Sequence, residues 1–126
     1  MKQRVETTAP WAATVGYSRA VRVNDTIHVS GTASVAADGS IAHPGDAYRQ
    51  ARRCLEIIVA ALRDLGAGPE HVVRTRMYVR SPEDWEAVGR AHGEVFSAIR
   101  PATTMVFTGF IDPGMLVEIE ADAILK

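Results

Sequence analysis

The sequence predicts an α+β fold in which one mixed β-sheet of about six strands carries two long helices on one face. Two segments, residues 46–65 and 81–99, place apolar side chains at helical spacing. Several shorter segments alternate between apolar and polar side chains, as half-buried strands do. The elements follow one another in the order β-β-α-β-α-β-β, with a further short edge strand expected near residues 3–6. This order favours two packed layers, a sheet and a pair of helices.

Length and composition favour a soluble protein of one domain, spanning residues 1–126. The formal net charge is -1 and the basic residues are spread along the chain, which argues against nucleic acid or an acidic membrane as a partner. The single cysteine, Cys54, excludes an internal disulfide and suits a reducing compartment. The sequence has no apolar signal-peptide core and no long apolar run, so we expect a cytoplasmic location.

The first two long strands form a predicted hairpin. Residues 17–23 and 26–30 alternate in polarity, and Asn24 and Asp25 between them suit a two-residue turn. Residues 36–45 follow as a loop, because they are rich in turn-forming Asp, Gly and Pro.

Residues 46–65 form the first predicted helix. Asp46 can cap its start, and Gly66 ends it. Its buried stripe repeats at helical spacing and consists of Ala47, Ala51, Cys54, Leu55, Ile58, Leu62 and Leu65. Because Cys54 lies in this stripe, we interpret it as a small buried hydrophobe.

A strand at residues 70–80 precedes the second predicted helix, residues 81–99. The strand alternates, with Val73, Thr75, Met77 and Val79 on one face and Arg74, Arg76, Tyr78 and Arg80 on the other. Ser81 and Pro82 form a favourable helix start, and Pro101 ends the helix. The apolar stripe of the helix consists of Trp85, Val88, Val95, Phe96 and Ile99, with His92 in its middle.

Two further strands, joined by a turn, are predicted near the C-terminus. Residues 103–108 are rich in β-branched and aromatic side chains, and residues 112–114 are strong turn formers. Residues 115–124 then alternate, with Val117, Ile119, Ala121 and Ala123 on one face and Glu118, Glu120 and Asp122 on the other.

The face of the sheet away from the helices needs a cover. We expect it to bear Tyr78, Met105 and Phe107, side chains that are costly to leave in water. Self-association into a closed cyclic oligomer is the simplest way to bury them.

Several short motifs, in order and at matching separations, resemble the Rid family, the YjgF-like reactive intermediate or imine deaminases. They are Gly16-Tyr17, Val29-Ser30-Gly31, the stretch HVVRTRMYVRSPEDWEAVGRAHGEVF, Pro101-Ala102, and LVEIEADA near the C-terminus. The resemblance covers residues 15–123 and implies a chorismate-mutase-like two-layer fold, a homotrimer, and a pocket for a small molecule at each subunit interface. It implies no cofactor, because water attack on an imine is already easy.

The same resemblance implies pocket roles for four residues. Tyr17, Ser30 and Gly31 would orient a ligand, and Glu118 would position or activate water as a general base. From the residues alone, a plain strand-ending turn and a solvated strand face are the commoner explanations. We also expect clefts walled by Tyr17 of one copy and by Thr103 and Glu118 of its neighbour.

Three positions depart from the family pattern. Thr103 stands after Pro101-Ala102, where imine-deaminating members carry an arginine that clamps the carboxylate of a 2-imino acid. Losing such a charged contact typically costs about 2–5 kcal/mol. Met105 replaces a cysteine found in many members, and Gly89 replaces an asparagine. These changes together predict a different ligand, with Thr103 and Met105 shaping the pocket wall.

Arg19 and His92 are candidates to compensate for the missing arginine. Arg19 lies two residues after Tyr17, hence on the same face of a regular strand, and could supply the positive charge; a surface arginine is the alternative. His92 could reach the pocket and titrate near neutral pH, although a core histidine with one hydrogen bond is the commoner case. No other histidine or cysteine pair stands at metal-ligand spacing with His92, so we predict no metal.

The leading hypothesis is therefore a Rid-family homotrimer that binds a small anionic metabolite between subunits and hydrolyses a C=N or related bond. A non-catalytic metabolite sensor or chaperone-like module using the same pocket is the alternative, favoured by the missing arginine. A ribonuclease, an activity sometimes attached to this family, is less favoured because the sequence shows no concentrated positive footprint.

Overall fold

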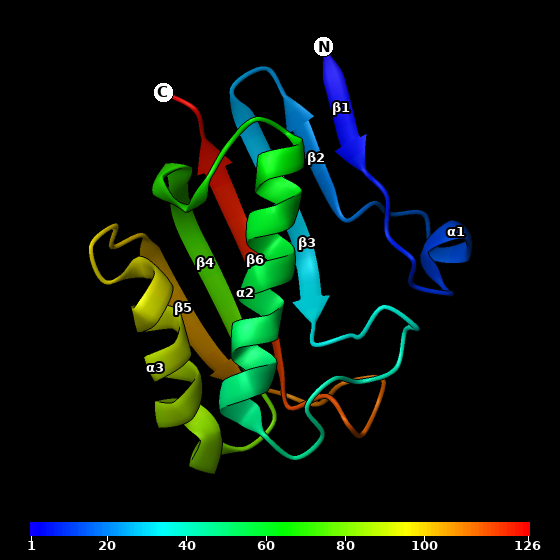
Figure 1. Cartoon of the computed structure of the whole chain (residues 1–126), viewed down its shortest axis with the longest axis vertical. Helices are drawn as coiled ribbons and strands as arrows, with labels where there is room; N and C mark the ends of the chain where they lie inside the picture. Colours follow the sequence, from blue (N-terminus) through cyan, green and yellow to red (C-terminus); the bar gives the residue numbers. More distant parts are fainter.

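The computed structural model describes all 126 residues and confirms the predicted α+β fold (Figure 1). The strands form one sheet in the order β1-β2-β3-β6-β4-β5. Their bounds are β1 (Lys2–Val5), β2 (Ala20–Val23), β3 (Thr26–Ala33), β4 (Val72–Val79), β5 (Ala102–Phe107) and β6 (Val117–Ile124). The helices are α1 (Ala12–Val15), α2 (Ala47–Asp64) and α3 (Trp85–Phe96), with short 3-10 turns at Pro69–His71 and Pro82–Asp84.

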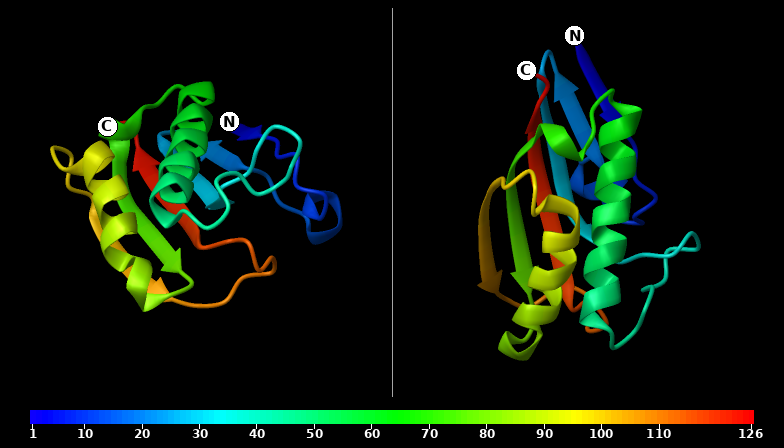
Figure 2. Two further views of the ribbon diagram at one scale, coloured as in Figure 1. Left: turned by 60° about the horizontal axis from the view of Figure 1, so that its bottom comes forward. Right: turned by 60° about the vertical axis from the view of Figure 1, so that its left-hand side comes forward.

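The two long helices cover one face of the sheet. Helix α2 packs on β3 and β6 near the middle of the sheet, and α3 lies beside α2. Figure 2 shows both helices on the same side. The core between the two layers is continuous and contains side chains from both helices and from four strands. None of the helices combines the length and the apolar character needed to cross a bilayer.

The predicted hairpin forms between β2 and β3, and its turn has the expected chemistry. Val23 pairs with Thr26, so that Asn24 and Asp25 are the two turn residues, and Asn24 takes the positive φ of 54° that such turns require. Strand β2 begins only at Ala20, three residues later than predicted, because the residues before it continue from the short helix α1.

Helix α2 confirms the prediction in its ends and in its buried face. The Asp46 carboxylate accepts a hydrogen bond from the backbone N–H of Arg49 at 2.9 Å, and Gly66 follows the helix with a φ of 87°. All seven residues of the predicted stripe are buried. Cys54 is fully buried, and this burial raises the pKa of its thiol, which fits an inert packing residue.

The second helix is shorter than predicted. A 3-10 turn follows Ser81, whose hydroxyl accepts from the N–H of Glu83, and α3 ends at Phe96 rather than at residue 99. Trp85, expected in the apolar stripe, is 54% exposed. Periodicity places Trp85 on the correct side of the helix, but cannot tell whether a neighbouring element reaches the helix start.

The predicted faces of β4 are correct from Thr75 onward and wrong at Val73. Thr75, Met77 and Val79 are buried against the helices, whereas Val73 is 44% exposed and Val72 is buried instead. The pairing of β4 with β6 shifts between Val72 and Arg74. Such a bulge inserts one residue, so the side chains on its far side exchange faces.

The two C-terminal strands are not neighbours. Strand β4 lies between β5 and β6, and β5 pairs with β4 in parallel. The alternation predicted for β6 is confirmed, with all four of its apolar residues from Val117 to Ala123 buried. The chain between residues 108 and 116 therefore crosses the end of β4 instead of making a tight hairpin turn.

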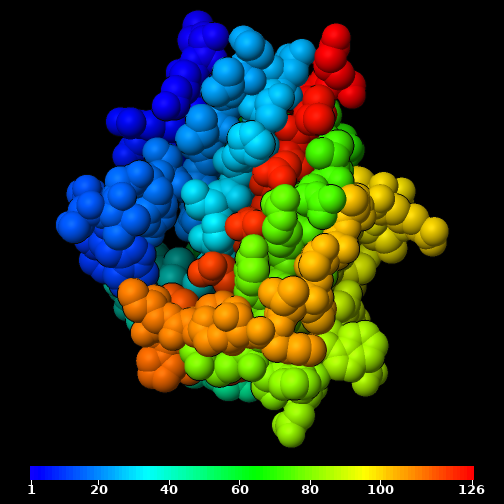
Figure 3. Space-filling view, turned by 180° about the vertical axis from the view of Figure 1, so that it is seen from behind, coloured from blue at the N-terminus to red at the C-terminus, as the bar shows by residue number.

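The expected composition of the open sheet face is wrong at two of three residues. Met105 pairs with Met77, and Phe107 pairs with Val79, so both point to the helix side. Only Tyr78 lies on the open face, which Figure 3 shows without any covering helix. The expectation failed because β5 pairs in parallel with β4 in a register that the sequence does not reveal.

A polar ladder occupies this open face in place of the expected apolar surface. His28 contacts Asp122 at 2.7 Å, and Arg76 lies 3.3 Å from both Asp122 and Glu120. The Tyr78 hydroxyl donates to Glu120 at 3.1 Å. The ladder joins β3, β6 and β4 across the sheet, so the acidic residues of β6 are largely paired.

Gln50 on α2 connects two loops at one end of the sheet. Its side-chain amide nitrogen donates to the backbone oxygens of His43 at 3.2 Å and Gly114 at 3.1 Å. Its side-chain oxygen accepts from the backbone N–H of Leu116 at 2.9 Å. Gln50 is fully buried, so these three bonds account for all but one of its hydrogen-bonding positions.

Replacing Gln50 with leucine should lower the free energy of unfolding by about 1–3 kcal/mol, because the partly buried N–H of Leu116 would lose its acceptor. Urea denaturation followed by circular dichroism measures this change. The exposed neighbour Arg49 provides the control, since Arg49→Ala should change stability by less than about 0.5 kcal/mol. Equal effects of the two substitutions would show that the Gln50 contacts contribute nothing specific.

Candidate functional site

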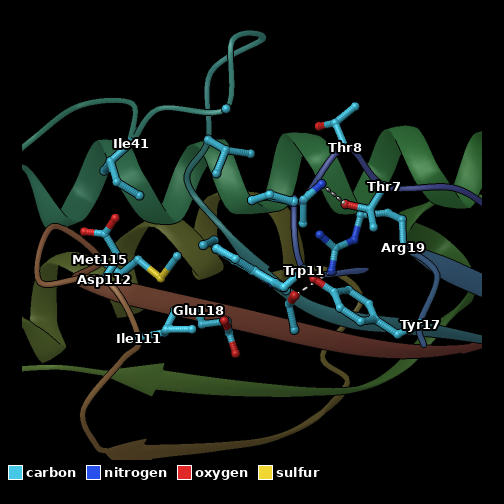
Figure 4. A pocket seen from close by; sticks show the side chains of 16 residues that line it. Thr7, Thr8, Trp11, Tyr17, Arg19, Ile41, Ile111, Asp112, Met115 and Glu118 are labelled. Carbon is cyan, nitrogen blue, oxygen red and sulfur yellow. Dashed lines mark hydrogen bonds between the residues drawn. The ribbon is translucent and has the colours of Figure 1, made fainter. Parts of the chain in front are cut away.

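A cavity of about 150 Å³ lies where the N-terminal segment meets the ends of β3 and β6 (Figure 4). Residues 7–11 and the loop at 111–115 form two of its sides. Its polar and charged lining brings together Tyr17, Arg19, Asp112 and Glu118, from segments far apart in the sequence. Three of the residues assigned to a ligand site from the sequence, Tyr17, Arg19 and Gly31, therefore share this cavity with Glu118.

An irregularity in β3 shapes this cavity. Between Val29 and Thr32, β3 advances three residues while its partner β6 advances two, from Ala121 to Ile119. The extra residue is a bulge that interrupts the ladder and leaves backbone groups free for other partners.

Arg19 forms hydrogen bonds with backbone groups that the bulge leaves unpaired. Its backbone oxygen accepts from the N–H of Ser30 at 2.9 Å, and its side-chain Nη2 donates to the Gly31 oxygen at 2.5 Å. The Nε atom is buried and has no acceptor. Burial lowers the pKa of Arg19, and the nearby Tyr17 and Glu118 oppose this shift. Since arginine normally titrates far above neutral pH, Arg19 remains a cation in the cavity.

Glu118 lies over the backbone of Gly31 on the open side of the sheet. A Cβ atom at Gly31 would come within 2.5 Å of Glu118 Oε1, so a larger residue at this position would force the carboxylate to move. Neither carboxylate oxygen takes part in a protein hydrogen bond or salt bridge, which leaves both free for a ligand or water. Burial raises the pKa of Glu118, while Arg19 lowers it and Glu120 raises it.

Ser30, also expected in the pocket, is not part of the cavity lining. Its hydroxyl donates to the backbone oxygen of Ser18 at 2.7 Å, which ties the bulge to the segment that carries Tyr17 and Arg19. Ser30 therefore positions other residues from a bulge inside β3, and not from the strand-ending turn that was the alternative, since β3 continues to Ala33.

The remaining predicted site residues lie elsewhere, near β5. Thr75 links two of them, because its hydroxyl lies 2.8 Å from His92 Nε2 and 2.7 Å from the Thr103 hydroxyl. Met105 packs at the edge of the core, and Gly89 on α3 has no neighbouring atom within reach of an added Cβ. Their ligand-binding roles stay predictions, since this chain alone does not bring them to the cavity.

His92 has the environment of a structural histidine. Besides its contact with Thr75, its ring packs on Phe96 with 4.7 Å between ring centroids. Burial lowers the pKa of His92, so the ring is neutral at pH 7 and supplies no positive charge in place of the missing arginine.

The expected division of the site between copies stays a prediction, but one chain alone arranges two of its residues differently from the expectation. Tyr17 and Glu118 line the same cavity of one chain, whereas the sequence interpretation assigned Glu118 to the wall of Thr103. Thr103 pairs with Thr75 on the helix side of the sheet, and Glu118 lies on the open face. The two side chains are separated by β4 and point to opposite faces.

Sequence reasoning missed the apolar part of the cavity. This part consists of Pro10, Trp11, Val35, Ile41, Ile111 and Met115. Trp11 and Ile111 are unusually exposed for apolar residues, at 38% and 77%. They come from irregular segments without periodicity, so no pattern in the sequence indicated that they would meet. No group of three His, Cys, Asp or Glu side chains is arranged to hold a metal ion.

The chain matches the family described as Endoribonuclease L-PSP over residues 6–125. The solved structure of Rv2704 from Mycobacterium tuberculosis, a member of the YjgF/YER057c/UK114 family, is 40% identical to this chain, with a TM-score of 0.88. The alignment covers 98% of this chain and 99% of Rv2704. This chain therefore belongs to the endoribonuclease L-PSP family, which is also called the YjgF or Rid family.

Two further relatives are similar to this chain over most of its length. An uncharacterized protein of Streptomyces coelicolor is 39% identical over 122 residues, which is 96% of this chain and 90% of the relative. The 3-aminoacrylate deaminase RutC of Acinetobacter baylyi is 30% identical over 107 residues, or 85% of each protein.

Replacing Glu118 with glutamine should remove one pH-dependent component of stability. Because the folded protein raises the pKa of Glu118, it binds a proton more tightly than the unfolded chain does. The wild type should therefore lose stability as pH rises from the unfolded carboxyl range through the raised pKa, and the variant should not. Urea denaturation at roughly pH 4 to 8 should show that the stability of the variant, relative to that of the wild type, increases as pH rises. A difference in stability between wild type and variant that does not change with pH would contradict the assignment.

Proposed function

We propose that this protein binds a small anionic metabolite in the cavity around Arg19 and Glu118 and hydrolyses a C=N or enamine C–N bond. The observation that supports this proposal most directly is the pairing of a cation with a carboxylate in one small cavity. The cation can hold an acidic group of the ligand, and the carboxylate can transfer a proton. Tyr17 would orient the ligand, and no cofactor is needed for this chemistry.

Arg19 is the best-placed residue to replace the family arginine. Thr103 carries no charge, and His92 is neutral at pH 7, so neither can hold a carboxylate as an ion pair. Arg19 lies within the cavity lining, and its buried Nε has no protein acceptor. A guanidinium in a partly dry site forms strong, directional hydrogen bonds to carboxylates.

Glu118 would act on water. With its pKa raised, the carboxylate is a better base than an exposed glutamate and can accept a proton from water as the oxygen attacks the carbon of the C=N bond. The protonated Glu118 would then return this proton to the nitrogen to give a carbinolamine. Glu118 would next move the remaining hydroxyl proton to the nitrogen, so that ammonia leaves as the C–N bond breaks and the carbonyl forms. The net reaction consumes one water and releases one ammonia, with no change in oxidation state.

The deaminase relative supports this substrate class. The name 3-aminoacrylate denotes a small carboxylate that bears an enamine, and RutC aligns with most of this chain. An anionic enamine combines the two features that Arg19 and Glu118 suit: an acid to bind and a C–N bond to hydrolyse. The substrate of this protein need not be the same compound, because the family arginine is replaced by Thr103.

A non-catalytic metabolite sensor is the second candidate function. It would use the same cavity and the same cation, and the absence of the family arginine favours it. A ribonuclease, as in the family description, is less favoured because the net charge is -1 and several arginines are already paired within the fold.

We also propose that the protein is a homotrimer, with copies meeting at the open sheet face and at the exposed edge strand β5. The β5 edge is uncharged, and Val106 and Phe107 are 43% and 49% exposed, so it lacks the charges that usually protect a free edge. A neighbouring copy would bring its own Thr103, Met105 and His92 region toward the cavity.

Glu118→Gln should lower the rate of ammonia release from 2-imino acids or 3-aminoacrylate generated in situ by about 10²- to 10⁴-fold. Carboxylate binding should persist, because Arg19 is intact. Glu86→Gln, on the exposed side of α3, is the matched control and should turn over at the wild-type rate. Wild-type protein that binds carboxylates but releases no ammonia would exclude the enzyme and support the sensor.

Sedimentation equilibrium should give a mass of three times the 13.6 kDa of one chain. Val106→Lys should weaken the assembly, since a charge on the edge strand opposes pairing. A wild-type mass equal to one chain at micromolar concentration would contradict the proposed trimer.

A further inference from the structure

Arg19 stands between two cavities. The second cavity has a volume of about 340 Å³ and lies between the N-terminal segment, the loop after β3 and the outer side of α2. Thr7, Thr8, Arg19 and Val35 line both cavities. Figure 4 shows the Arg19 side chain between Thr7 and Tyr17, in front of α2. The guanidinium is therefore part of the wall that the two cavities share.

Hydrogen bonds hold Arg19 in place between the two cavities. Its backbone N–H donates to Val5 at 2.7 Å, and its backbone oxygen accepts from Ser30 at 2.9 Å. The third contact, from Nη2 to the oxygen of Gly31, holds the end of the side chain. A side chain held at both ends keeps its place when a ligand enters.

The two cavities differ in what they can accept. The first has the size of a cavity that holds benzene, roughly six heavy atoms. The second has an apolar surface contributed by Val5, Ile57 and Ala60, among others. The Arg53 guanidinium there donates to Val35 at 2.9 Å and to Glu56 at 3.4 Å, and the carboxylates of Glu6, Glu56 and Asp64 also line the cavity and would repel an acid. The second cavity thus suits a hydrocarbon chain better than a second acid.

We propose that Arg19 determines specificity in two ways: it binds the acidic end of the ligand, and it limits ligand length by closing the first cavity off from the second. The proposal rests on the proposed function only in that the ligand is an anion held in the first cavity. The favoured ligand class is short carboxylates of about six heavy atoms. A longer chain is excluded while Arg19 is in place.

Straight-chain carboxylates from propanoate to octanoate, titrated by isothermal calorimetry, test this proposal. For the wild type, affinity should rise about fourfold per added methylene and then stop rising near butanoate, which has six heavy atoms. Arg19→Met should bind every carboxylate at least tenfold more weakly and keep the same length limit, because it removes the charge and retains most of the wall. Arg19→Ala should lose both the charge and the limit, so that affinity keeps rising through octanoate.

Two control variants separate the possible failures. Arg19→Ala combined with Ala60→Phe should regain the length limit, because Ala60 lines only the second of these two cavities. Arg49→Gln, on the exposed side of α2, should behave as wild type. If wild-type affinity rises without a break to octanoate, or if a folded Arg19→Ala keeps the limit on chain length, the proposed length limit is overturned while the anion site stands. Failure of the wild type to bind any carboxylate would overturn the anion site and the proposed function with it.

Discussion

The candidate site depends on one extra residue in β3. The bulge between Val29 and Thr32 breaks the ladder with β6, and Arg19 bonds to backbone groups of the two residues within the break. Because Gly31 has no side chain, Glu118 of the neighbouring strand can lie over it. A regular ladder at this point would use the same backbone groups within the sheet, and the cation would lose its acceptor.

Burial affects the protonation of the two charged residues of the site differently. It lowers the pKa of Arg19, but the ordinary pKa of arginine is so far above neutral pH that the side chain stays charged. It raises the pKa of Glu118, which brings this carboxylate nearer to the range where it can exchange a proton. Arg19 limits that rise through its own charge. The same physical effect makes His92 neutral, so the positive charge and the proton-transfer group both belong to the cavity of one chain.

Local rules account for the elements that the sequence predicted correctly. Asp46 and Gly66 bound α2, and Asn24 with Asp25 closes the hairpin, because caps and turns depend on a few adjacent residues. The errors fall where distant segments meet. Val73 is exposed because of a bulge against β6, and Met105 faces the helices because β5 pairs in parallel with β4. The alternation of side chains within a strand does not specify either of these pairing registers.

The sequence by itself determined the two-layer fold and the family, because both are carried by the identity or spacing of residues along the chain. Only the tertiary structure decided which residues share a cavity. Glu118 joins Tyr17 and Arg19, Ser30 turns away, and Trp11 and Ile111 complete the apolar wall. The reason is physical: strand register and a bulge select the face on which a side chain lies, and both arise from hydrogen bonds between segments far apart in sequence.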